Sequence, residues 1–167
     1  MGPTNQTNMK TRELQTLWWD WLSTSERLLR SLYEQTAALT LRDVARVERI
    51  QPELDQMLGR IQEIDRDAAT CARRLAEELG VEASFRSLVQ VLDKAEAQQI
   101  QGLANRVTIA SRNVQEVLKK NRALIENEMT YINGTLTLIA KATVESEGPF
   151  KSKKGSGSTA VLVDQAA

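Results

Sequence analysis

The chain has 167 residues, in which 22 Lys and Arg balance 22 Asp and Glu, with no histidine and one cysteine. Without histidine there is no imidazole base and no histidine ligand for zinc or haem, and one cysteine forms neither an intrachain disulfide nor a thiolate cage. Zero net charge argues against a nucleic-acid binder. We therefore expect no enzyme, no catalytic residue, no metal and no cofactor.

The two ends of the chain differ in composition from its body. Residues 1–10 are polar and have no apolar period, which predicts a flexible arm. They carry no basic stretch followed by an apolar region, so we expect no secretory signal and a cytoplasmic protein. No apolar run approaches the ~20 residues that cross a bilayer, which predicts no membrane insertion.

Helical periodicity begins at residue 11 and predicts a first helix of roughly seven turns. Trp18 and Trp21 lie on its apolar stripe, whereas Trp19 points about 100° away from Trp18. The pattern fits two roles for Trp19 equally well. Its side chain is exposed and contacts a partner, or it packs against the short helix predicted next. Thr40 followed by Asp43 matches a capping box and predicts a break near residue 40.

A short helix is expected over Leu41 to Ile50, with Pro52 in the first turn of the helix after it, where the missing amide hydrogen costs nothing. That next helix is expected to end at Leu79, with Gly80 as its left-handed cap. Its apolar residues form two series with a spacing of seven, which keeps one seam toward a partner helix. The series are Leu54, Ile61, Ala68 and Leu75, and Met57, Ile64 and Cys71. Cys71 is therefore expected to be buried and inert.

Ser84 is a predicted N-cap for a helix that carries Phe85 and Leu88 on one face. The stretch from Asp93 to Gln99 contains no helix breaker, and the pattern leaves a continuous helix and a bend both open. A long apolar seam then runs from Ile100 to Leu124. It includes Asn121, and a polar residue on such a seam commonly fixes the register of the helices.

Past Leu124 the apolar pattern shifts by one residue, to Ile125, Met129, Ile132, Leu136 and Ile139. From Met129 to Ala140 there is no charge, and apolar residues lie on more than one side of the predicted helix. Such a helix is buried on two sides or offers one side to a partner. The pattern favours a partner-binding surface.

The helical pattern ends at Thr143, and the Gly, Ser and Lys residues beyond it predict a disordered tail over residues 144–167. The predicted organisation is an arm over residues 1–10, one helical domain over residues 11–143, and the tail. The predicted fold is all-α: an elongated antiparallel bundle or coiled-coil-like hairpin with two or three long helices and one or two short ones.

This layout resembles the flagellar export chaperones of the FlgN type over roughly residues 11–167. The segments that carry the resemblance are Leu41–Ile50, Pro52–Gly80, Leu118–Ile139 and the ending Val161–Ala167. In the Asn-x-x-Asn-x-x-Leu run typical of the family's last helix, Asn121 and Leu124 match, while Leu118 stands in place of the first Asn. Phe150 is the nearest aromatic counterpart of the Tyr-Gly turn that follows that helix in the family.

The resemblance implies a cytoplasmic chaperone that binds hook-filament junction proteins, prevents their premature assembly and presents them to the flagellar type III export apparatus. It nominates Asn121, Leu124 and Phe150 as partner contacts. The residue pattern adds Ile125, Tyr131, Ile132, Leu136, Ile139 and Trp19. A self-associating coiled-coil module without a client is the alternative, and the sequence leaves monomer and dimer both open.

Overall fold

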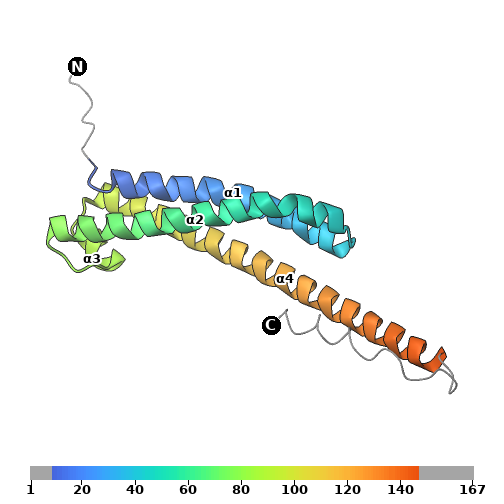
Figure 1. Ribbon diagram of the computed structural model, residues 1–167. Helices are drawn as coiled ribbons and strands as arrows, with labels where there is room; N and C mark the ends of the chain where they lie inside the picture. The colour runs from blue at the N-terminus through green and yellow to red at the C-terminus, as the bar shows by residue number, and fades with distance from the viewer. Residues whose placement is uncertain (1–8, 147–167) are drawn as a thin grey trace. The chain divides into compact units, whose positions relative to one another are not determined.

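The computed structural model describes residues 9–146, which contain helices and no strand (Figure 1). The helices are α1 (Arg12–Thr40), α2 (Val44–Leu79), α3 (Phe85–Gln90) and α4 (Lys94–Ser146). The all-α prediction, with three long helices and one short one, is confirmed. The chain divides into two compact units, which we call unit 1, ending at Ile125, and unit 2, beginning at Glu126.

Some predictions fall outside the described residues. These are most of the predicted arm (residues 1–8) and the tail from residue 147 onward, with Phe150. Helix α4 itself continues to Ser146, three residues beyond the predicted end of the helical pattern.

A tight turn joins α1 to α2. Arg42 has a φ of 56°, and the carboxylate of Asp43 caps α2 by accepting a hydrogen bond from the Arg46 amide at 3.1 Å. The predicted break near residue 40 is therefore confirmed, although the capping residue is Asp43 and Thr40 closes α1. Figure 1 shows α1 and α2 side by side, as the two arms of a hairpin.

The predicted separate helix over Leu41–Ile50 is wrong, because α2 runs through Pro52 without interruption. The Pro52 nitrogen has no hydrogen to donate to the Glu48 carbonyl, but both residues are exposed, so water can hydrate that carbonyl. Ile50 and Leu54, four residues apart, are both buried in one core cluster. A continuous helix is what places both side chains on the same side.

The ends of the middle helices follow the predicted signals. Gly80 ends α2 with a φ of 67° and a ψ of 32°, which only glycine adopts at little cost. The Ser84 hydroxyl caps α3 by accepting a hydrogen bond from the Ser87 amide at 3.1 Å. The sequence left a continuous helix and a bend both open over Asp93–Gln99. In the structure the chain bends before Lys94, and α4 begins at that residue.

The core of unit 1 lies between α1, α2 and the first part of α4. Both sevenfold series of α2 face this core, with six of their seven members buried and Ile61 half-buried. Representative contacts are Leu32, Met57 and Val114 in one cluster, Trp21, Ile64 and Leu103 in a second, and Leu14, Cys71 and Ile100 in a third. The predicted burial of Cys71 is confirmed.

Two hydrogen-bonded contacts show that α1 and α4 run parallel in one fixed register. The Thr11 amide and hydroxyl donate to Glu96 Oε1 at 2.8 and 2.7 Å, and both residues are buried. Further along, the Thr36 hydroxyl donates to Asn121 Oδ1 at 2.6 Å. Each pair is 85 residues apart, so the offset does not change between the two contacts. Helix α2 is antiparallel to both.

Replacing Glu96 with Ala should lower the free energy of unfolding by about 1–3 kcal/mol, because the buried Thr11 amide and hydroxyl lose their acceptor. Urea unfolding followed by circular dichroism measures the change. Glu116→Ala on the exposed side of α4 is the control, with an expected change within about 0.5 kcal/mol. Equal loss in both variants would contradict a stabilising role for the Thr11–Glu96 contact.

Burial raises the pKa of the Cys71 thiol, and the nearby negative charge of Glu13 raises it further. A higher pKa means less of the reactive thiolate at pH 8. Iodoacetamide should therefore label the folded protein far more slowly than the protein in 6 M urea. Mass spectrometry of the alkylated chain over time measures both rates, and equal rates would show that Cys71 is accessible.

Candidate functional site

Asn121 lies at the centre of a buried polar contact between α4 and α1. Its Nδ2 donates to the Leu32 carbonyl at 3.0 Å and to Gln35 Oε1 at 2.9 Å, and its Oδ1 accepts from the Thr36 hydroxyl. Both Nδ2 hydrogens and Oδ1 are thus paired inside unit 1. With 2% of its surface exposed, Asn121 fits the register role expected for a polar residue on an apolar seam. It offers no exposed area to a partner.

The register that Asn121 helps to fix determines where α1 stops covering α4. The offset of 85 residues matches Thr40, the last residue of α1, to Ile125 of α4. Unit 1 ends at the same residue. Leu124 is half-buried and Ile125 is 41% exposed, so burial along α4 falls off at this point.

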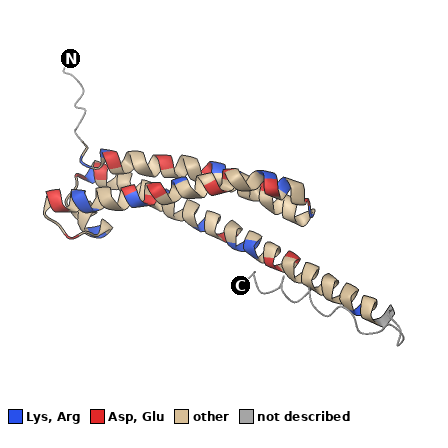
Figure 2. Cartoon of the chain, viewed as in Figure 1, with Lys and Arg blue, Asp and Glu red and all other residues tan. Residues whose placement is uncertain are grey.

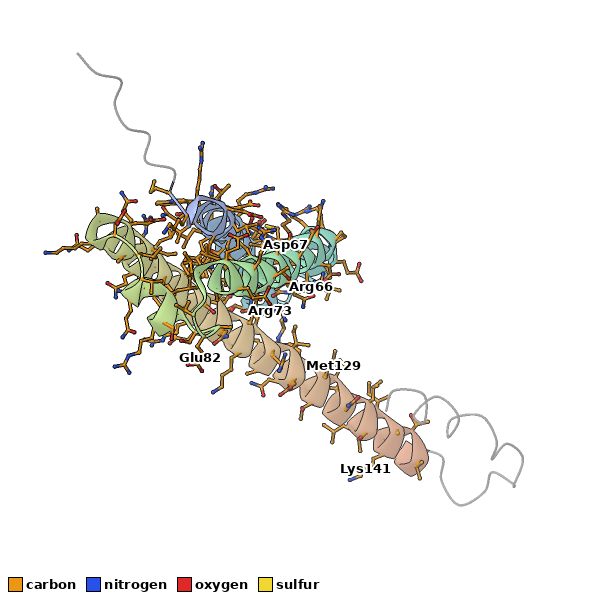
Figure 3. All side chains as sticks on the ribbon, turned by 90° about the vertical axis from the view of Figure 1, so that its left-hand side faces the viewer. Arg66, Asp67, Arg73, Glu82, Met129 and Lys141 are labelled. Carbon is orange, nitrogen blue, oxygen red and sulfur yellow. The ribbon has the colours of Figure 1, made fainter. Side chains whose placement is uncertain are left out.

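Unit 2 carries a group of large exposed apolar side chains, which we call the apolar face. Each of its members is between 48% and 68% exposed. They are Met129, Tyr131, Ile132, Leu136, Leu138 and Ile139. No charged residue lies between Met129 and Ala140, and Figure 2 shows this uncharged stretch of α4 in tan. Figure 3 labels Met129 and Lys141, which mark the two ends of the stretch. An exposed apolar patch of this kind is typical of an interaction site.

The structure brings together four of the nine residues predicted from sequence as partner contacts. Tyr131, Ile132, Leu136 and Ile139 all belong to the apolar face, and Ile125 is the last residue of unit 1. Met129 and Leu138 complete the face, although the sequence analysis did not nominate them as site residues. Two features of the sequence point to these residues. The stretch carries no charge, and its apolar residues lie on more than one side of the predicted helix.

Trp19 is not part of the apolar face. It lies on α1 in unit 1 and is 49% exposed, with the guanidinium carbon of Arg106 from α4 4.7 Å from its ring centroid. This is a cation–π contact that the sequence pattern did not predict. A partner-binding role for Trp19 stays a prediction.

Within residues 9–146, no group of three or more Cys, Asp or Glu side chains is placed to hold a metal ion. None of the described helices combines the length and apolar character that crossing a bilayer requires.

A family model described as FlgN protein matches residues 9–148, a range that takes in all four helices. No curated protein and no solved structure matches the chain.

Replacing Asn121 with Ala should lower the free energy of unfolding by about 1–3 kcal/mol, because the Oε1 of buried Gln35 loses the amide that donates to it. Thermal unfolding followed by circular dichroism measures the shift. The control is Asn113→Ala, at an exposed position of α4. A shift no larger than that of the control would contradict the role given to the buried amide.

Proposed function

Because the chain belongs to the FlgN family of flagellar export chaperones, we propose that it binds hook-filament junction proteins through the apolar face of α4. In this proposal it acts in the cytoplasm, prevents premature assembly of these clients and delivers them to the type III export apparatus. The observation that carries the proposal is the exposure of six large apolar side chains on one uncharged stretch of helix.

The apolar face supports client binding on energetic grounds. Complete burial of a large apolar side chain is worth roughly 1.5–3 kcal/mol relative to full exposure. Each residue of the face already hides part of its surface, so covering the remainder contributes on the order of 1 kcal/mol per residue before the cost of association. Six such residues contribute on the order of 6 kcal/mol, and the apolar side chains that the client buries in the same contact add to this.

The chemistry of the face also favours a client of a particular kind. Between Met129 and Ala140 no charge has to be stripped of water when a partner covers the helix, so binding carries no large desolvation penalty. An amphipathic helix laid against such a surface gains affinity from apolar anchors three and four residues apart. Client segments with exposed apolar faces associate prematurely for the same reason, and covering them prevents it.

The proposed activity consists of binding and release, without a chemical step. It assigns no catalytic residue and no cofactor. Delivery to the export apparatus is proposed from family membership, and no residue of the chain is assigned to that contact.

A self-associating module is the second candidate, because the apolar face could also meet a second copy of the chain. Residues Met129, Ile132, Leu136 and Ile139 have the three-and-four spacing of a coiled-coil seam. Light scattering of the purified chain distinguishes the two. The chaperone hypothesis predicts a monomer at micromolar concentration, whereas a tight dimer that buries the apolar face favours the structural module.

Replacing both Leu136 and Ile139 with Asp should abolish binding of purified hook-filament junction protein, because two charges would be buried in the interface. Isothermal titration calorimetry measures the loss, and the helical circular dichroism signal should remain. The control carries two charges on the opposite side of the helix, as Thr130→Asp with Thr137→Asp. Unchanged client binding by a folded Leu136→Asp, Ile139→Asp variant would rule out the apolar face as the client site.

A further inference from the structure

The apolar face continues a pattern that the molecule itself covers in unit 1. Val117 and Leu118 of α4 pack on the core cluster that α1 and α2 build. Each of these two residues begins a column, by which we mean residues spaced seven apart along α4 and therefore on nearly the same side of the helix. The first column is Val117, Leu124, Tyr131 and Leu138, and the second is Leu118, Ile125, Ile132 and Ile139. Both columns are apolar throughout. Val117, Leu118 and Leu124 are half-buried, whereas from Ile125 onward the members of both columns are exposed.

Beyond unit 1 a third apolar column joins these two. Arg122 is exposed in unit 1, but the residues seven and fourteen positions further on are Met129 and Leu136. The three columns of unit 2 together span about half of the helix circumference, because Leu136 and Leu138 lie about 160° apart around the axis. The seam that one partner helix covers is narrower than this.

We propose that the apolar face binds two amphipathic helical segments of the client at once, as an antiparallel pair, in the way that α1 and α2 together cover α4 in unit 1. The inference rests on the proposed function and specifies the partner. One client helix covers the side of Leu138 and Tyr131, and the other covers the side of Leu136 and Met129. Ile132 and Ile139 lie between them and contact both.

The shape and charge of the face fit this occupant. Thr135 and Ala142, whose side chains are small, lie between the first two columns. Neither client helix meets a charge between Met129 and Ala140, so the contacting sides of both are expected to be apolar and uncharged. Charged residues of the client are expected on the sides that face away from α4.

A second copy of the chain fits the face less well. In a symmetric dimer built on this surface, each copy contributes only its own α4 to the contact. One helix covers one seam of the apolar face and leaves one of the three columns exposed. A client that contributes two helices covers all three columns. The width of the apolar arc therefore favours a different protein over a second copy of the chain.

Three consecutive residues allow a matched test of the pair. Leu136→Asp and Leu138→Asp place the same charge on the two outer columns, and Thr137→Asp places it on the opposite side of the helix, about 100° from each. The probe is the full-length hook-filament junction protein from the same host, titrated by calorimetry. Leu136→Asp and Leu138→Asp should each weaken Kd roughly tenfold or more, and Thr137→Asp should change it by less than about twofold.

The outcomes separate the inference from the proposed function. If Leu136→Asp weakens binding and Leu138→Asp behaves as Thr137→Asp does, the client supplies one helix, and the pair is ruled out while the chaperone function stands. If none of the three variants weakens binding, the proposed client site itself is wrong. If the chain alone is a dimer that Leu138→Asp dissociates, the occupant is a second copy and the inference fails.

Photo-crosslinking keeps the inference testable even if an Asp variant folds poorly. A benzoylphenylalanine introduced in place of Leu136, and in a second protein in place of Leu138, reports which client residues lie against each column. The helix pair predicts crosslinks in two separate client segments. Crosslinks from both positions into one continuous helix would overturn it.

Discussion

The turn at Leu41–Asp43 limits how much of α4 the hairpin of α1 and α2 can cover. Helix α1 lies parallel to α4 in a register fixed at one end by Thr11 and Glu96 and at the other by Thr36 and Asn121. In that register Thr40 corresponds to Ile125, and α2 begins its return at Val44. Helix α4 nevertheless continues to Ser146 with the same apolar columns. The exposed apolar face follows from this difference in length.

The polar contacts that fix the register also divide α4 into two parts with different roles. In unit 1, α4 is a structural element whose apolar seam packs against α1 and α2, with Ile100, Leu103 and Val114 buried. From Met129 onward, side chains of the same type are exposed. Sliding α1 against α4 would break the buried hydrogen bonds of Asn121 and Glu96, and leaving such groups unpaired is costly. The amount of apolar surface left for a partner is therefore set by the fold.

Local signals in the sequence predicted most of the secondary structure. Gly80, Ser84 and the sevenfold series of α2 act through short-range geometry, and each prediction from them is confirmed. Pro52 misled the prediction because its local preference for a first turn is outweighed by the burial of Ile50 and Leu54 on one helix. The Thr11–Glu96 contact and the stacking of Arg106 on Trp19 join residues far apart in sequence, so no local pattern could have revealed them. The existence of the apolar face could be predicted, because it depends only on the residues along one helix. The residue at which it starts could not be predicted, because it depends on the register of α1 against α4.

Hydrogen exchange on the complex tests the central claim most directly. We propose that the client covers α4 beyond Ile125, the residue beside which α1 ends. Comparison of free and client-bound protein by mass spectrometry should show that backbone amides of residues 126–144 exchange more slowly in the complex, while those of α2 exchange at the same rate in both. Slowed exchange confined to α1 and α2, with residues 126–144 unchanged, would contradict it.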